Sequence, residues 1–325
     1  MPKNRTYWWI FSILMLCGCL PIASKESTAV AFQPATITII SVQPTATALS
    51  TATPGPPTPI PPTTTLPPIP IPPTTTPIPD LVAGLTIPDL RSRNYGDGEI
   101  RIGEVYNQNA GYTSYHITYP ADGLQLTGLV HVPDGAGPFP VIIANRGYIA
   151  PERYLPGMDS RAFSDFMARS GYLIVAPDYR GYGGGDNGPN PFYTGYYADV
   201  LNLIPLTQTL PIACAGKVGM WGHSRGASIT VAALTISDQI AAAVVYAPAP
   251  ADLAVDYEQR QRQGSNQADS DTWPFHPAQN PTAYQRVSPI NYLDAVTVPV
   301  MLHHGTADTV VDASASIAIA ETLRT

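Results

Sequence analysis

A serine between two glycines stands at residues 222–226, in the order Gly-His-Ser-Arg-Gly. The apolar residues 218–221 before it predict a buried strand, and the Ala-, Ile- and Val-rich residues 227–236 after it predict a helix. A strand, a tight turn and a helix in this order hold a serine in a strained turn, where the glycines avoid clashing Cβ atoms. We therefore expect Ser224 to be a nucleophile that attacks an acyl carbon and forms an acyl-enzyme.

A carboxylate that could act together with the Ser224 nucleophile follows the buried strand predicted at residues 297–302. Asp308 ends the turn Gly-Thr-Ala-Asp, where a carboxylate can orient a histidine and stabilise the imidazolium that forms during catalysis. The alternative is that Asp308 only shapes this turn. Asp312 is the second candidate carboxylate, although its position favours capping of the helix predicted at residues 313–323.

The charge that develops on an attacked carbonyl oxygen needs two hydrogen-bond donors. One is expected to be the backbone N–H of Arg225, because this residue follows the nucleophile. The other is expected from the turn Asn-Arg-Gly-Tyr at residues 145–148, after a predicted central strand. Asn145 could donate through its side-chain amide, or Tyr148 through its backbone N–H. An ordinary turn between a strand and a helix is the alternative.

Strands and helices alternate around these candidate residues. Strands are predicted at residues 112–119, 124–132, 140–144, 172–177, 218–221, 240–246 and 297–302, and helices at residues 160–169, 196–203, 227–236 and 313–323. This alternation predicts an α/β fold with a mostly parallel sheet that is covered by helices on both faces.

Three stretches together resemble the α/β-hydrolase superfamily and, within it, the prolyl oligopeptidase family of serine peptidases, of the dipeptidyl aminopeptidase and acylaminoacyl-peptidase type. They are Pro-Asp-Tyr-Arg-Gly-Tyr-Gly-Gly at residues 177–184, the serine motif, and the segment at residues 298–311 that contains Asp308. The resemblance implies an α/β-hydrolase fold and hydrolysis of peptide bonds, with no metal and no cofactor. Related esterases carry similar segments, so a carboxylesterase acting on small or carbohydrate-linked esters is the alternative.

A catalytic triad consists of a serine, an aspartate and a histidine, and here the histidine is absent from its usual place. In this fold the triad runs Ser, Asp, His along the chain, and the resemblance implies a histidine a few dozen residues after Asp308. All 6 histidines precede Asp308, and Thr325 falls within the last predicted helix. We expect a C-terminally truncated sequence that lacks the last strand and helix of the fold. Otherwise the chain is a catalytically dead hydrolase-fold module, because Ser224 has no base to take its proton.

The N-terminal residues 1–20 predict an export signal. Basic residues precede an apolar core at residues 7–16 that is too short to span a bilayer comfortably. The following Leu-Cys-Gly-Cys resembles the lipobox of bacterial lipoproteins, which implies lipidation of Cys19. Cys17 departs from the small residue that is usual there, and a plain secretory signal or an uncleaved anchor is the alternative. We therefore expect a bacterial protein that is lipid-anchored to the cell membrane or extracellular.

Residues 21–80 are dominated by Pro and Thr and predict a disordered linker, because such a composition cannot bury enough apolar surface to fold. The hydrolase domain is expected at residues 81–325, with a cap-like insertion at about residues 249–288. The aromatic residues at 273–275 could line a substrate pocket or simply pack this insertion onto the domain.

The expected partners are a small-molecule or peptide acyl substrate and, through the N-terminal anchor, a membrane. The formal net charge of -7 argues against nucleic acid as a partner, since phosphate backbones are bound by basic surfaces.

Overall fold

The computed structural model describes residues 80–264 and 272–324. The predicted signal peptide, the lipidation of Cys19 and the Pro/Thr-rich linker lie outside these ranges. Within them, no helix combines the length and the apolar character that crossing a bilayer requires.

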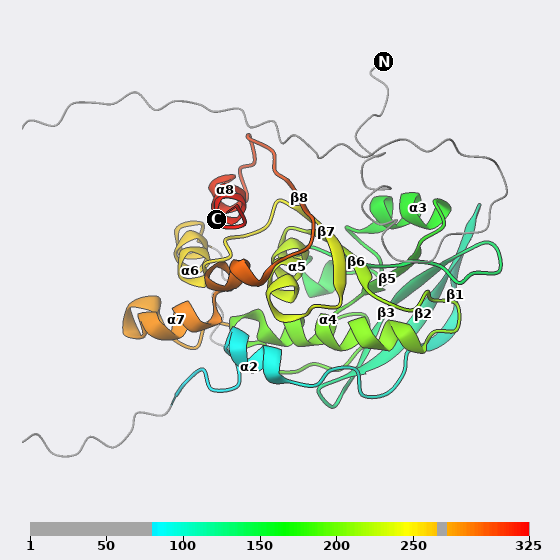
Figure 1. The fold of residues 1–325 in the computed structure, drawn as a ribbon, viewed down its shortest axis with the longest axis horizontal. Coiled ribbons are helices and arrows are strands. Elements are labelled where there is room, and N and C mark those ends of the chain that lie inside the picture. The colour runs from blue at the N-terminus through cyan, green and yellow to red at the C-terminus, as the bar shows by residue number, and fades with distance from the viewer. Residues whose placement is uncertain (1–79, 265–271, 325) are drawn as a thin grey trace, which may run out of the picture. The chain divides into compact units, whose positions relative to one another are not determined.

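In the described part of the chain, strands form one sheet in the order β1-β2-β3-β5-β4-β6-β7-β8 (Figure 1). Their bounds are Arg101–Asn109 (β1), Tyr112–Ala121 (β2), Leu124–Pro133 (β3), Val141–Asn145 (β4), Leu173–Pro177 (β5), Val218–His223 (β6), Ile240–Tyr246 (β7) and Val300–His303 (β8). β1, β2 and β3 pair antiparallel with one another, and β3 pairs antiparallel with β5. From β5 to β8 all pairs are parallel. The predicted mostly parallel sheet is thus confirmed, with an antiparallel edge added.

The helices of the described residues are Ile87–Ser92 (α2), Arg161–Arg169 (α3), Thr194–Leu206 (α4), Arg225–Ile236 (α5), Leu253–Arg262 (α6), Pro281–Val287 (α7) and Ser314–Thr322 (α8). Short 3-10 helices lie at Pro151–Arg153, Pro191–Tyr193, Thr207–Thr209, Pro277–Gln279 and Pro289–Ala295. Every strand and helix expected from the sequence is present, with ends that shift by a few residues. The additional elements are β1, α2, α6 and α7.

Helices cover both faces of the sheet, because successive side chains of the central strands point to opposite sides. Ile143 and Val175 join the large apolar core with α4 and α5, whereas Ile142 and Ile174 pack with Met167 of α3 in a second core. Figure 1 shows α3 on one side of the sheet and α4 and α5 on the other. The predicted α/β architecture is therefore confirmed.

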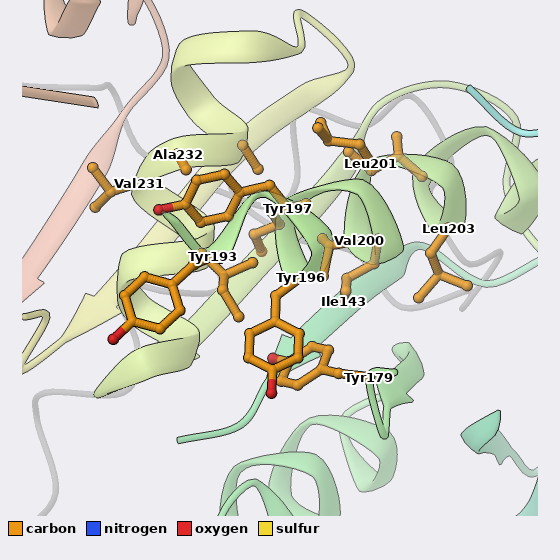
Figure 2. Close-up of a cluster of buried hydrophobic side chains, with 14 of the residues drawn as sticks. Ile143, Tyr179, Tyr193, Tyr196, Tyr197, Val200, Leu201, Leu203, Val231 and Ala232 are labelled. Atoms are coloured by element: carbon orange, nitrogen blue, oxygen red, sulfur yellow. The ribbon is translucent and has the colours of Figure 1, made fainter. Parts of the chain in front are cut away.

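The larger core is built around α4, which is buried on all sides apart from Pro205. Most of its residues are apolar, and its buried Asp199 is paired with Arg180 at 2.7 Å, as a buried charge requires. Figure 2 shows its residues Tyr197, Val200 and Leu203 among side chains from the sheet and from α5. Tyr196 packs against Tyr179, with ring centroids 5.3 Å apart.

The insertion between β7 and β8 contains α6 and α7, and its aromatic residues pack it onto the domain. Trp273 is buried and lies parallel to Tyr284, with ring centroids 6.2 Å apart. Phe275 meets Phe192 edge-on at 5.6 Å. Of the two interpretations left open by the sequence, these contacts favour packing.

Candidate active site

Ser224 occupies a strained turn between β6 and α5, with φ 52° and ψ -120°. Its N–H donates to the carbonyl of Tyr246 at 2.9 Å. A Cβ atom at Gly226 would lie 2.0 Å from the Asn145 carbonyl oxygen, and one at Gly222 would lie 2.3 Å from the Gly226 carbonyl oxygen. The backbone therefore requires glycine at both positions, and it holds the serine as a nucleophile elbow does.

Ser224 opens onto a cavity of about 350 Å³. Its walls come from the two predicted oxyanion residues, from α6 and from the segment after Asp308; they include Tyr148, Arg225, Asp256, Gln259, Arg260, Gln263, Val310 and Val311. A neighbouring cavity of about 880 Å³ contains Asp308 and shares Gln259, Gln263 and Val310 with the first. Ser224 and Asp308 therefore line two adjoining cavities.

Asp308 follows β8 and is held by its own turn. Its Oδ1 atom accepts hydrogen bonds from the N–H groups of Val310 at 2.8 Å and Val311 at 3.0 Å. These bonds hold the pKa of Asp308 below its ordinary value, so the carboxylate is ionised at neutral pH. Asp312 instead accepts a hydrogen bond from the Ser314 N–H at 2.8 Å. The N-cap of α8 is Ala313 and no side chain caps the helix, so the capping role expected of Asp312 is not seen.

Both ring nitrogens of His304, the histidine near Asp308, contact groups of the surrounding structure. Its Nδ1 lies 2.7 Å from Ser316 Oγ, and its Nε2 lies 2.9 Å from the Val311 carbonyl oxygen and 3.5 Å from Asp308 Oδ2. Both ring nitrogens thus have partners away from Ser224. Within residues 80–264 and 272–324, no histidine nitrogen is hydrogen-bonded to the Ser224 hydroxyl.

The oxyanion candidates divide into two that face the cavity and one that does not. Arg225 is the first residue of α5 and lines the cavity. Tyr148 lines the cavity beside Ser224. The side chain of Asn145, however, is fully buried, and its amide donates to Thr230 Oγ1 at 2.9 Å. The expectation that this amide serves the oxyanion is therefore not met, because Asn145 ties the turn to α5 instead.

Arg146 supports the same turn from inside the protein, a role that the sequence did not reveal. Its guanidinium lies 3.9–4.8 Å from the ring centroids of Tyr154, Tyr179 and Tyr182. It also donates to the Asp178 carbonyl oxygen at 2.6 Å. The cation–π contacts and the hydrogen bond fix the residue between Asn145 and Gly147.

A second unpredicted residue, Asp159, lies beside the elbow. Asp159 accepts a hydrogen bond from the Gly147 N–H at 2.6 Å and pairs with His223 Nδ1 at 2.8 Å. Its position directly before α3 is typical of a helix cap, so the sequence offered no sign of a contact with residues 147 and 223.

The cavity wall opposite Ser224 is charged. Arg260 Nε lies 3.0 Å from Asp256 Oδ2, and burial raises the pKa of Asp256. The Arg225 guanidinium lies 4.8 Å from the ring centroid of Tyr148 and 4.9 Å from that of Tyr193. Polar groups of a substrate would therefore meet charged and aromatic side chains here. No group of three or more His, Cys, Asp or Glu side chains in the described ranges could hold a metal ion.

Comparison with known proteins assigns the chain to a family. A profile of the prolyl oligopeptidase family matches residues 160–325, about half of the chain. The uncharacterized peptidase YtmA of Bacillus subtilis (strain 168) is 28% identical over 213 residues, which are 65% of this chain and 79% of that protein.

Two solved structures share the fold at low sequence identity. Acetyl xylan esterase 1 from Thermoanaerobacterium superposes with a TM-score of 0.55 and 17% identity, over 70% of this chain and 78% of the esterase. The acylaminoacyl peptidase of Pyrococcus horikoshii superposes with a TM-score of 0.55 and 22% identity, over 66% of this chain but only 35% of the peptidase. The chain has the α/β-hydrolase fold and belongs to the prolyl oligopeptidase family, and at the level of that family it is a serine hydrolase.

Proposed function

We propose that this protein hydrolyses peptide bonds through an acyl-enzyme on Ser224. The observation that carries the proposal is the strained Ser224 in the wall of a cavity that Arg225 and Tyr148 also line. A serine at φ 52° persists only where the surrounding structure holds it, and such strain gathers at functional sites.

The proposed reaction follows from the placement of these groups. Ser224 Oγ attacks the acyl carbon, and the negative charge on the carbonyl oxygen is received by the backbone N–H groups of Arg225 and Tyr148. The bond to the leaving amine breaks, and water then hydrolyses the acyl-enzyme. The serine proton passes to water, and the leaving amine takes a proton from water. Asp308 supplies an ionised carboxylate of the kind that orients an imidazole base. No histidine of the described residues occupies that position.

Ester hydrolysis is the alternative activity of the same site. The matched relative is named a peptidase, and one of the structures with the same fold is named an acetyl xylan esterase. The cavity of about 350 Å³ suits a small acyl group, and its charged wall suits a polar one. Peptides and small or carbohydrate-linked esters can both present a small, polar acyl group.

Parallel assays of the full chain with an aminoacyl anilide and a p-nitrophenyl ester test this proposal. Turnover of the anilide supports the peptidase, whereas ester turnover without anilide turnover leaves only the esterase. Ser224→Ala abolishes both activities. Asp308→Asn is expected to lower kcat by about 10³–10⁴-fold only in a form of the protein that supplies an imidazole base for this carboxylate to orient. The matched variant Asp312→Asn stays within about threefold of the unmodified protein.

A non-catalytic binding module is the second candidate, since no described histidine nitrogen is hydrogen-bonded to Ser224. A fluorophosphonate probe separates the two functions, because it modifies only an activated serine. Labelling of Ser224 rules out the inactive module. A chain that stays unlabelled at high probe concentration, while it still binds an aminoacyl anilide or a p-nitrophenyl ester without turnover, supports the module.

We further propose export and lipid anchoring through Cys19, on the basis of the predicted signal and the lipobox-like segment. Expression in a bacterium fed an alkyne fatty acid tests this. Cys19→Ser is expected to abolish incorporation of the label, whereas Cys17→Ser is expected to retain it. Label on the Cys19→Ser variant would contradict the assignment.

A further inference from the structure

Three separate segments meet at Gly147, in the turn that follows β4. A Cβ atom at this glycine would lie 2.9 Å from Asp159 Oδ2, 3.2 Å from Ser224 Cβ and 3.4 Å from His223 Nδ1. The turn that carries Tyr148, the elbow that carries the nucleophile and the segment before α3 are therefore in direct contact. A shift of any one of them changes the position of the others.

Asp159 is the side chain that joins these segments. Its Oδ2 atom accepts the Gly147 N–H at 2.6 Å, and its two oxygens lie 2.9 and 2.8 Å from His223 Nδ1. One carboxylate thus binds the backbone of the turn and the side chain next to the nucleophile. Hydrogen bonds to a charged group are about twice as strong as those between neutral groups.

The backbone at Asp159 is held in an unfavourable conformation. Its φ of 70° lies in the left-handed region, which only glycine enters freely and which aspartate tolerates better than most residues. Such a conformation persists only where the surrounding structure holds it. The contacts with Gly147 and His223 are the interactions that hold the carboxylate in this place.

The charges around the pair favour an ion pair. The hydrogen bond to Asp159 raises the pKa of His223 above its ordinary value of 6.5, with help from the charge of Asp308 and against the effect of burial. Burial raises the pKa of Asp159, but the bonds from His223 and Gly147 and the charge of Arg146 outweigh it, so this pKa is lowered.

The remaining neighbours of His223 are aromatic or weakly basic. The Tyr246 ring of β7 lies 5.6 Å from the imidazole and the Trp221 ring of β6 lies 6.5 Å from it. His303 of β8 stacks on the far side of Tyr246 at 6.0 Å, and burial lowers its pKa. The carboxylates that act on His223 are therefore Asp159, in direct contact, and Asp308, through its charge.

We propose that Asp159 and His223 are positioning residues, a clamp that fixes the Gly147–Tyr148 backbone against the elbow so that the Tyr148 N–H points at the developing oxyanion. This inference rests on the proposed function, in which that N–H is a donor. While His223 is protonated the clamp is an ion pair. When His223 loses its proton, the ion pair becomes a hydrogen bond from a neutral imidazole to the charged carboxylate, and the turn is held less firmly.

Nuclear magnetic resonance of the isotope-labelled full chain tests the clamp without any need for turnover. We expect the Gly147 amide to titrate together with the His223 imidazole, with a midpoint above 6.5. In Asp159→Asn the His223 midpoint falls toward 6.5 and the Gly147 amide no longer follows it. In His223→Gln, which keeps a neutral donor, the Gly147 titration disappears. Either a Gly147 amide that ignores His223 or an unchanged His223 midpoint in Asp159→Asn overturns the clamp.

Asp165→Asn is the matched control, because Asp165 lies on α3 and pairs with Arg169 at 2.8 Å on the surface. It leaves the Gly147 and His223 titrations unchanged. Where Ser224 reacts with a fluorophosphonate, Asp159→Asn and His223→Gln slow the labelling about tenfold, and Asp165→Asn stays within about twofold. An unreactive Ser224 in the unmodified chain refutes the proposed function, while the titration still decides the clamp.

Discussion

The nucleophile and the carboxylate of this site are held in place by different means. Around Ser224, a Cβ at Gly222 or Gly226 would lie 2.0–2.6 Å from several backbone atoms. Around Asp308, the contacts are hydrogen bonds from its own turn, and a Cβ at Gly305 would meet nothing within 4 Å. Close packing of the main chain thus positions the nucleophile, whereas a local turn positions the carboxylate.

The difference follows from where the two strands lie in the sheet. β6 pairs with β4 and β7 on its two sides, and α5 packs directly on it, so the elbow is enclosed. β8 pairs only with β7 among the described strands, and all of its residues are half-buried. The elbow can therefore tolerate little change, and the turn that carries Asp308 can tolerate more.

The largest effect is expected from a methyl group at Gly226. Gly226→Ala places a Cβ 2.0 Å from the Asn145 carbonyl oxygen and 2.5 Å from that of Arg146, which forces main-chain movement. We expect a loss of about 3–5 kcal/mol in the free energy of unfolding. Gly305→Ala is the matched variant in the other region, and its effect should stay within about 0.5 kcal/mol. Urea denaturation measures both; equal losses would contradict the comparison.

Ser224→Gly is expected to stabilise the protein although it removes the nucleophile. Glycine relieves the strain at φ 52°, and the gain should be about 1 kcal/mol after the greater entropy of the unfolded glycine chain is subtracted. Ser224→Ala keeps a Cβ in the strained turn, so its stability should lie within about 0.5 kcal/mol of the unmodified protein. Thermal denaturation compares the two variants, and a glycine variant no more stable than the alanine variant would show that the elbow carries no strain.

The smallest effect on stability is expected at Asp308. Its pKa is lowered from 3.8 by the N–H groups of Val311 and Val310, so its stabilisation is present above pH 3.8 and is lost as the pH falls through the lowered value. Asp308→Asn keeps an oxygen acceptor, and at pH 7 the free energy of unfolding should change by less than about 0.5 kcal/mol. Urea denaturation at pH 7 and pH 3 tests this; a large loss at pH 7 would mean that Asp308 stabilises more than its own turn.

The sequence predicted the strands whose residues show a clear apolar pattern. The central strands were predicted because their residues are apolar on both faces, as in Ile142 and Ile143. β1 was missed because its residues are nearly all exposed and its three large apolar residues, Ile102, Val105 and Tyr106, do not alternate with polar ones. Its strand character depends on pairing with β2, which a short sequence window does not contain.

The same distinction applies to the candidate site. Ser224 and Asp308 were found through local motifs, and the structure places them on two adjoining cavities. Asp159 was missed because its contact with His223 spans 64 residues and depends on a left-handed backbone. The role expected of the Asn145 amide was wrong because Thr230 of α5 lies beside the turn, a neighbour that residue order does not reveal.

The hairpin of β2 and β3 has a consequence for the order of folding. Asp122 and Gly123 both have positive φ, at 52° and 79°, which suits a two-residue hairpin turn, and the strands pair without interruption from Ala121 opposite Leu124 to Tyr112 opposite Pro133. Such a local hairpin forms in about 1–10 μs, whereas the parallel pairs around the elbow must first close long loops. The antiparallel edge is therefore expected to form early and the elbow late. Substitutions at the elbow should then speed unfolding more than they slow folding.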